Sequence, residues 1–377
     1  FIGIGGAGMS SIARYLNKKG WSVSGYDKTE TPLTDQLKQE GININFEIVD
    51  SSIPEEIKKI DLLLVTTPAI SSDHPHLVAL KKLGHKAIKR AELLGEITKS
   101  KATLAISGTH GKTSTTALLA HIIDGTPQRC NAFIGGVSAE IDSNLYYSPN
   151  AKWNIVEADE FDRSFHHLHP THAVITSLDP DHLDVYGSEP NFIEAFKIFA
   201  SQVKEKVVIH HSIATTFNNL QNIETYGLED CSFTHYATDL SQTSSGTSFT
   251  LSLGNGKMVI PHVRVDLMGK HNLENIVAAA ALAYLAGADK EIISSRINSF
   301  KGIYRRFQIH LNSKFKVYID DYAHHPTEVS ATLQAANSGW DRRVISIFQP
   351  HLFSRTRDFH MDFAKAFLDT DILIVTD

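Results

Sequence analysis

The segment "ISGTHGKTSTT" at residues 106–116 contains the residues best suited to bind a phosphate chain. Backbone N–H groups of a glycine loop before a helix attract phosphate oxygens, a lysine reaches the outer phosphates, and a hydroxyl can bind Mg²⁺. Position 106 is Ile where the full pattern has Gly, so the match is to a shortened G-x-x-G-K-T form. A chance helix cap is disfavoured because an apolar strand precedes the loop. The expected phosphate-binding residues are Gly108, Thr109, His110, Gly111, Lys112, Thr113 and Ser114.

Acidic residues and a histidine follow two further apolar segments. In "WNIVEADEFD" (153–162), Glu157 at the strand end is a candidate Mg²⁺ ligand, with Asp159 as the alternative. In "TSLDPDHLDVYG" (176–187), His182 is a candidate ligand for a second cation. A structural histidine and a solvated strand end are the competing interpretations. The expected metal ligands are Thr113, Glu157 and His182.

The opening "GIGGAG" (3–8) fits the G-x-G-x-x-G pattern, and Asp27 follows at about the spacing of 20 residues that the dinucleotide fingerprint has. These glycines allow a diphosphate to approach a helix N-terminus closely, so NAD, FAD or a nucleotide-sugar diphosphate would all fit. An NAD-dependent oxidoreductase is therefore an alternative, but it leaves Lys112, Glu157 and His182 without a role. A non-catalytic nucleotide-binding module is a third hypothesis.

Arginine and histidine gather in four later segments, which read "MGKHNLEN" (268–275), "YRRFQ" (304–308), "DDYAHHP" (320–326) and "FQPHLFSRTRD" (348–358). Such groups in strand-to-helix loops suit carboxylates and phosphates. By contrast, His166, His167 and His169 are interpreted as solvated loop residues, because adjacent side chains point in different directions.

The elements that would position these residues alternate between strands and helices. Expected strands at 1–4 and 21–26 flank a helix at 8–19, and Thr31 and Pro32 open the next helix. This β-α-β rhythm predicts parallel sheets. A polar stretch at 98–102 marks a boundary, hairpins are expected at 232–265, and a third β-α-β pattern starts near residue 307.

We therefore expect an α/β protein of three domains. The expected ranges are 1–98, an N-terminal domain; 99–300, a central phosphate-loop domain with added β-hairpins; and 301–377, a C-terminal domain. The third is expected to be incomplete because the sequence ends in an apolar strand, and no initiator Met opens the chain.

Composition excludes several other classes of protein. The 377 residues carry 36 Lys and Arg against 42 Asp and Glu, with no long basic run, which disfavours nucleic acid as a partner. The longest apolar run, 276–286, is too short to cross a bilayer. Cys130 and Cys231 lie far apart, so no disulfide framework is expected, and a cytoplasmic location without membrane partners is predicted.

Eight motifs in one order resemble the Mur ligases of peptidoglycan synthesis: "GIGGAGMSSIA", "SGTHGKTSTT", "EADEFDRSF", "DPDHLDVYG", "GKHNLENIVAA", "YRRFQ", "DDYAHHP" and "QPHLFSRTRD". The resemblance covers the whole chain. It implies a Rossmann-like N-terminal domain that binds UDP, a central ATPase and a Rossmann-like C-terminal domain that binds the amino acid. ATP would phosphorylate the carboxylate of UDP-N-acetylmuramate, and the amine of L-alanine would attack the acyl phosphate. A family member that adds a recycled tripeptide is the alternative, and a monomer and a dimer both remain open.

The resemblance also implies individual roles. Thr113 and Glu157 would hold Mg²⁺ on the nucleotide, and His182 a second ion. Asn275 would contact the adenine, Asp321 would contact the ribose and Arg306 would lie near the terminal phosphate. His324, His351 and Arg355 would orient alanine. Lys112, His182, Glu157, His324 and Arg355 form the expected catalytic set. The expected UDP-sugar contacts are Gly3, Gly5, Gly6, Gly8, Met9, Ser10, Asp27 and Ser164. Leu352 stands where the family more often has Arg, so Arg355 or Arg357 would have to compensate.

Overall fold

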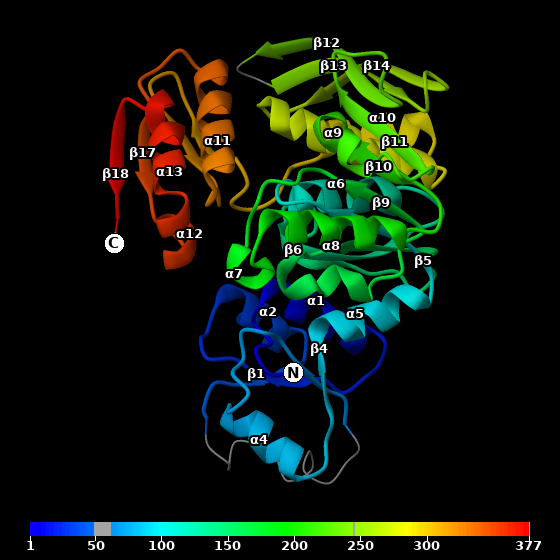
Figure 1. The fold of residues 1–377 in the computed structure, drawn as a ribbon, viewed down its shortest axis with the longest axis vertical. Helices are drawn as coiled ribbons and strands as arrows, with labels where there is room; N and C mark the ends of the chain where they lie inside the picture. Colours follow the sequence, from blue (N-terminus) through cyan, green and yellow to red (C-terminus); the bar gives the residue numbers. More distant parts are fainter. Residues whose placement is uncertain (49–61, 244–245, 377) are drawn as a thin grey trace.

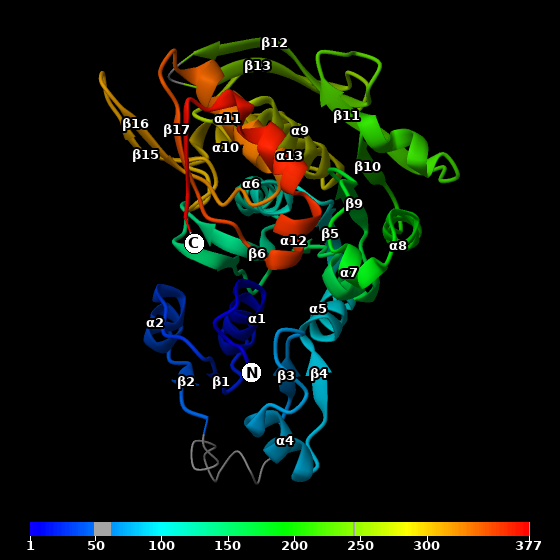
Figure 2. The ribbon, with the colours of Figure 1, turned by 60° about the vertical axis from the view of Figure 1, so that its left-hand side comes forward.

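The computed structural model describes residues 1–48, 62–243 and 246–376. The chain forms three α/β parts. The N-terminal part lies at one end of the long axis of the molecule, the central sheet and its helices extend to the other end, and the C-terminal part lies beside the central part (Figure 1 and Figure 2). The α/β, three-domain prediction is confirmed.

Two pairs of short parallel strands form the N-terminal part, β1 with β2 and β3 with β4. Its elements are α1 (Ala7–Lys18), β1 (Ser24–Tyr26), α2 (Pro32–Gln39), β2 (Asn43–Asn45), β3 (Leu64–Thr66), α4 (Pro75–Lys82), β4 (Ala87–Lys89) and α5 (Arg90–Lys99). Thr31 caps α2 and Pro32 occupies its first turn, as predicted.

The strand expected at residues 1–4 is reduced to one bridge between Ile2 and Tyr26. The Ile2 N–H donates to the Val65 carbonyl at 2.9 Å and the Gly3 N–H to the Tyr26 carbonyl at 2.8 Å, so this segment lies between the two strand pairs. Gly3 has a φ of +83°, which ends regular pairing and turns the chain into α1.

A ten-stranded mixed sheet with the order β14-β13-β12-β11-β10-β9-β5-β8-β6-β7 forms the centre. Its strands are β5 (Ala102–Ser107), β6 (Cys130–Ser138), β7 (Ser143–Tyr146), β8 (Trp153–Glu157), β9 (His172–Ile175), β10 (Val207–His210), β11 (Ile223–Leu228), β12 (His235–Thr243), β13 (Gly246–Leu253) and β14 (Met258–Val265). The last three strands pair antiparallel, which confirms the predicted hairpins.

Helical segments connect and cover these strands. They are α6 (Lys112–Asp124), η2 (Phe161–His167), α7 (Leu183–Tyr186), α8 (Glu189–Ser201), η3 (His211–Phe217), α9 (Lys270–Leu285) and α10 (Lys290–Ser299). Because β5 runs parallel to both β8 and β9, the loops that follow these three strands emerge at one edge of the sheet. That edge brings the phosphate loop beside both acidic segments.

Alternate residues of the central strands bury opposite faces of the sheet. In β8, Ile155 packs with α6 and α9, while Val156 packs with α8 and with helices of the N-terminal part. The alanine run of α9 is fully buried, because small side chains let this helix lie close to α6. A continuous apolar core therefore joins the N-terminal part to the central sheet.

The C-terminal part contains β15 (Gln308–Asn312), β16 (Val317–Asp320), α11 (Pro326–Gly339), β17 (Ile345–Phe348), α12 (Phe353–Asp358), α13 (His360–Ala366), η4 (Phe367–Asp369) and β18 (Ile372–Val375). Strands β15 and β16 pair antiparallel, and β17 pairs with β18 in parallel. Within the described ranges, no helix has the length and apolar character needed to cross a membrane.

Candidate active site

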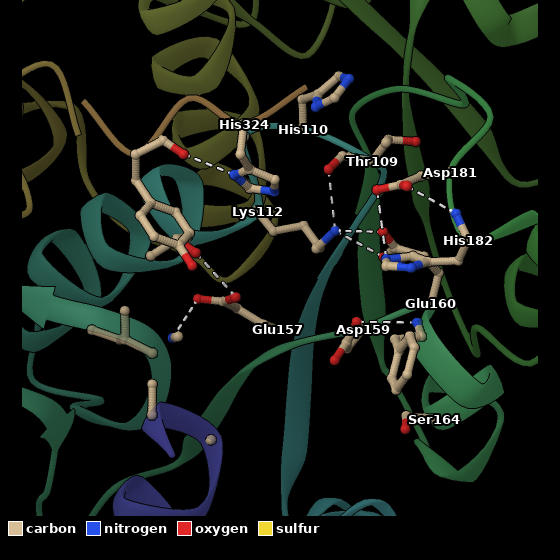
Figure 3. A pocket seen from close by; sticks show the side chains of 18 of the residues that line it. Thr109, His110, Lys112, Glu157, Asp159, Glu160, Ser164, Asp181, His182 and His324 are labelled. Atoms are coloured by element: carbon tan, nitrogen blue, oxygen red, sulfur yellow. Dashed lines mark hydrogen bonds and ion pairs between the residues drawn. The ribbon is translucent and has the colours of Figure 1, made fainter. Parts of the chain in front are cut away.

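One cavity of about 1270 Å³ is lined by residues from all three parts of the chain. Most of the predicted site residues line it, and Figure 3 shows the phosphate-loop side. They are Gly3, Gly6, Gly8, Met9, Asp27, Thr109, His110, Gly111, Lys112, Thr113, Ser114, Glu157, Ser164, His182, Asn275, Arg306, Asp321, His324, His351 and Arg355. Gly5, Ser10 and Gly108 do not line it. The individual roles of all these residues stay predictions.

The phosphate loop requires glycine at two positions. Gly108 has a φ of +124°, and a Cβ there would collide with Thr176. Gly111 has a φ of +77°, and a Cβ there would collide with the Asn275 side chain. The second contact places Asn275 of α9 directly against the loop, so the predicted adenine-reading residue and the phosphate loop are neighbours.

The Lys112 ammonium lies in a cage of oxygen atoms. Its Nζ is 2.8 Å from each carboxylate oxygen of Glu160 (Figure 3). It is also 2.6 Å from the Gly108 carbonyl. Burial lowers the pKa of Lys112, but the nearby carboxylates of Glu160 and Asp159 outweigh burial and raise it. Burial also raises the pKa of Glu160 to about 7. Because the pKa of Lys112 stays above that of Glu160, the proton of this ion pair resides on the lysine.

Glu157 is a half-buried carboxylate beside the hydroxyl of Thr113. It accepts a hydrogen bond from the Gly135 N–H at 2.6 Å and one from Thr113 Oγ1 at 3.2 Å. Burial raises the pKa of Glu157. A carboxylate and a hydroxyl are oxygen donors of the kind Mg²⁺ prefers, and a cation would offset the cost of burying this charge. These donors fit a Mg²⁺ ion that also binds phosphate oxygens.

His182 lies on the other side of the Lys112 ammonium from Glu157 (Figure 3). Its backbone adopts a φ of +54°, and its Nε2 is 3.5 Å from Asp181 Oδ2. Burial lowers the pKa of His182, so its imidazole is neutral near pH 7 and can donate a lone pair to a cation. Across the described residues, no group of three or more His, Cys, Asp or Glu side chains is arranged to hold a metal.

The C-terminal part contributes a buried arginine. Arg355 on α12 forms an ion pair with Asp181, with Nη2 at 2.9 Å from the carboxylate. Its Nε and Nη1 are buried and have no hydrogen-bond partner among the described residues. Nε and Nη1 lie on opposite edges of the guanidinium and cannot both face one carboxylate, but either one can donate a charge-assisted hydrogen bond to a ligand carboxylate. Arg357, the alternative that the sequence left open, has a side chain that is 75% exposed and pairs with Asp358.

Other side chains of the C-terminal part surround this arginine. His324 and His351 have ring centroids 6.2 Å apart, and Leu352 lines the cavity beside them. Asp321 accepts a hydrogen bond from Thr332 at 2.6 Å, and burial raises its pKa. The guanidinium of Arg306 lies 5.3 Å from the Tyr322 ring centroid.

The N-terminal glycine loop is held by Asp27, whose Oδ2 accepts a hydrogen bond from the Gly5 N–H at 2.7 Å. Arg90, at the start of α5, lies so close to Gly8 that a Cβ there would be 2.9 Å from its Nη1. Arg90 also pairs with Asp159 at 3.3 Å. Ser10 is fully buried; its Oγ donates a hydrogen bond to the Ala7 carbonyl and accepts one from Asn144. It therefore stabilises the glycine loop without facing the cavity.

Sequence reasoning missed several residues of the site, namely Arg90, Glu160, Asp179, Asp181 and Glu328. Glu160, Asp179 and Asp181 stand inside quoted acidic motifs, so a search for every carboxylate after a strand would have found them. Arg90 and Glu328 give no such signal, because their role depends on contacts between domains.

A phosphate loop, buried carboxylates beside it and a cationic pocket from a third domain define a nucleotide-dependent enzyme of the α/β class. Family models match almost the whole chain: "Mur ligase family, catalytic domain" at residues 1–102, "Mur ligase middle domain" at 106–283 and "Mur ligase, glutamate ligase domain" at 305–377. The chain belongs to the Mur ligase family, which confirms the resemblance found in the sequence.

Two curated relatives that are similar to this chain carry the name of one particular Mur ligase. The UDP-N-acetylmuramate–L-alanine ligase of Porphyromonas gingivalis is 42% identical over 383 residues, which cover 100% of this chain and 84% of the relative. The enzyme of the same name from Christiangramia forsetii is 42% identical over 382 residues, covering 100% and 82%.

Solved structures of Mur ligases resemble this chain over almost its whole length. The UDP-N-acetylmuramate-alanine ligase of Thermotoga maritima superposes with a TM-score of 0.84 at 27% identity, covering 100% of this chain and 84% of that one. A murein peptide ligase from Psychrobacter arcticus gives a TM-score of 0.76 at 24% identity, covering 99% and 83%, and shows the shared fold.

Proposed function

We propose that this protein is an ATP-dependent ligase that joins L-alanine to the carboxylate of UDP-N-acetylmuramate in peptidoglycan precursor synthesis, releasing ADP and phosphate. The observation that carries the proposal is the convergence of the phosphate loop, the N-terminal glycine loop and the Arg355 pocket on one cavity. The 42% identity to curated enzymes of that activity supports the choice of substrates.

The first step needs a concentration of positive charge. A carboxylate is a poor electrophile, and transfer of the terminal phosphoryl group to its oxygen creates a good leaving group. The backbone N–H groups of the phosphate loop and the Lys112 ammonium stabilise the negative charge on the transferring group. Glu160 keeps that ammonium protonated and directed towards the loop.

Mg²⁺ is proposed as the accompanying cation. Thr113 and Glu157 would hold an ion on the nucleotide, and His182 would hold a second ion near the acceptor carboxylate. Bound there, Mg²⁺ neutralises the phosphate oxygens. Asn275, Asp321 and Arg306 would contact the adenine, the ribose and the terminal phosphate, respectively.

The second step depends on the orientation of the amino acid. One of the two buried nitrogens of Arg355 without a partner among the described residues would donate a hydrogen bond to the alanine carboxylate, while His324 and His351 lie within reach of its amine. The amine attacks the acyl carbon, and the tetrahedral intermediate expels phosphate. Water exclusion matters here because an acyl phosphate hydrolyses readily.

The glycine loop and Arg90 would contact the UDP diphosphate, which approaches the N-terminus of α1. A cytoplasmic location is proposed because both nucleotide substrates belong to that compartment.

The test is phosphate release with ATP and UDP-N-acetylmuramate, with L-alanine, L-serine, glycine or the tripeptide of the related ligase as acceptor. We expect L-alanine to give the highest kcat/KM and omission of the sugar nucleotide to abolish release. Faster turnover of the tripeptide would reassign the acceptor. Micromolar NADH binding without ATP hydrolysis would reject the ligase proposal.

A further inference from the structure

One carboxylate, that of Glu328, is shared between two domains. Glu328 lies in the first turn of α11, and its side chain is only 16% exposed. Its Oε2 accepts hydrogen bonds from the backbone N–H groups of His324 at 3.0 Å and His325 at 3.2 Å. Its Oε1 lies 3.1 Å from Nδ1 of His110 in the phosphate loop. The two oxygens therefore face the C-terminal domain and the central domain separately.

His110 is held by carboxylates on both of its ring nitrogens. Its Nε2 is 2.9 Å from Asp179 Oδ2, in the loop after β9, at ion-pair distance but without hydrogen-bond alignment, while its Nδ1 forms a hydrogen bond with Glu328. Two ionised carboxylates beside one imidazole favour the form that carries a proton on both ring nitrogens. Burial lowers the pKa of His110, but the two carboxylates outweigh it and raise the pKa to about 9. His110 is thus an imidazolium between two domains.

Two neighbouring groups, His325 and Lys112, could in principle take the place of the His110 charge in the contact with Glu328, but neither does. The His325 ring lies 4.8 Å away, and burial lowers its pKa to about 4, so it is neutral. Lys112, two residues along, is engaged by Glu160 on the other side of the loop. The ionic link between the phosphate loop and α11 therefore depends on Glu328.

Glu328 and the Tyr322 carbonyl together fix the tautomer of the His324 imidazole. Nδ1 of His324 is 2.7 Å from the Tyr322 carbonyl and 3.3 Å from Glu328 Oε2. Both neighbours accept hydrogen bonds, so Nδ1 carries the proton and Nε2 retains its lone pair. Burial lowers the pKa of His324, which keeps this tautomer neutral near pH 7.

We propose that Glu328 is a positioning residue that couples the phosphate loop to the amino-acid side of the cavity, by holding His110 with one oxygen and the His324 loop with the other. This inference rests on the proposed ligase function. Its consequence is that α11, and with it the alanine pocket, is aligned on the loop that binds the phosphates. Loss of the link should impair the amino-acid step more than acyl-phosphate formation.

The test uses two near-isosteric substitutions. Glu328→Gln keeps an oxygen that can accept the two backbone N–H bonds but removes the charge, and His110→Asn keeps a donor near the position of Nδ1. For Glu328→Gln we expect KM for L-alanine to rise about tenfold or more, as a lost charge-assisted hydrogen bond implies. Single-turnover ADP formation without alanine should stay within threefold of the unaltered enzyme. In the double variant, the effects on kcat/KM for alanine should be strongly non-additive.

A matched control is available inside the central domain. His235 and Glu224 form a similar buried pair at 2.8 Å, and neither residue lines the cavity. Glu224→Gln and His235→Gln should lower Tm without changing KM for alanine. Additive effects of the Glu328 and His110 substitutions, an unchanged KM, or an equal loss in both half-reactions would overturn the coupling role. If Glu328→Gln does not fold, His110→Asn alone decides, through its KM for alanine.

A measurement independent of activity separates this inference from the proposed function. We expect the ¹⁵N spectrum of the His110 imidazole to show both nitrogens protonated at pH 8 in the unaltered protein, and one unprotonated nitrogen in Glu328→Gln. A neutral His110 at pH 8 in an active ligase would reject the inference alone. Absence of ligase activity with an intact imidazolium would reject the proposed function alone.

Discussion

Replacement of Arg355 by methionine tests the amino-acid pocket most directly. Methionine has a similar length and no charge, so it removes the guanidinium with little change in volume. Nη2 of Arg355 is already used by Asp181 at 2.9 Å, whereas Nε and Nη1 are buried without a partner among the described residues. If one of these N–H groups binds the carboxylate of alanine, the substitution removes a charge-assisted hydrogen bond.

The expected size of the effect follows from that bond. A hydrogen bond to a charged group contributes about 1.5–3 kcal/mol. At about 1.4 kcal/mol per factor of ten, KM for L-alanine should rise by roughly tenfold or more. The KM for ATP should change much less. Removing the guanidinium also leaves the buried Asp181 carboxylate without its cationic partner, so a lower Tm is expected as well.

The assay is phosphate release at varied L-alanine, with ATP and UDP-N-acetylmuramate saturating. Arg357→Met is the matched control, because Arg357 stands two residues along the same helix but has an exposed side chain that pairs with Asp358. Its KM for alanine should stay within twofold. The reasoning fails if Arg355→Met keeps a KM within threefold of the unaltered enzyme, or if Arg357→Met has the larger effect.

Three further substitutions test other parts of the site and fold. Lys112→Ala should lower phosphate release by roughly 10²–10³-fold because the transferring group loses its main protein cation, while UDP-N-acetylmuramate binding, measured by calorimetry, should persist. Gly111→Ala should raise KM for ATP because the added Cβ collides with Asn275, whereas Gly187→Ala, with a similar φ of +74° and open space around it, should cost only stability. The pKa of Glu224 falls to about 2, chiefly through its bond from a buried imidazole, so it contributes stability above pH 4.5 that is lost as the pH falls towards 2. Denaturant titrations of Glu224→Gln should therefore show a loss of roughly 2 kcal/mol at pH 7 that shrinks below pH 4.5, and a constant difference would refute this.

Local patterns predicted much of the architecture correctly. Thr31 and Pro32 open α2 as expected, since a capping side chain and a preset φ act within one turn. The expected strand 153–157 matches β8, because alternate burial on two faces leaves a readable apolar run. The strand expected at 1–4 was wrong in extent, because Gly3 turns the backbone after a single bridge.

The sequence by itself determined the family, the three-domain α/β fold and the list of candidate groups, because phosphate loops, strand ends and helix caps act through residues that are close along the chain. Only the tertiary structure decided which of these groups meet. Glu328 contacts a loop residue 218 positions away, and Arg355 pairs with an aspartate 174 positions away. Such contacts depend on how whole domains pack, which no short pattern encodes. The same packing buries the carboxylates and so sets which histidines are charged.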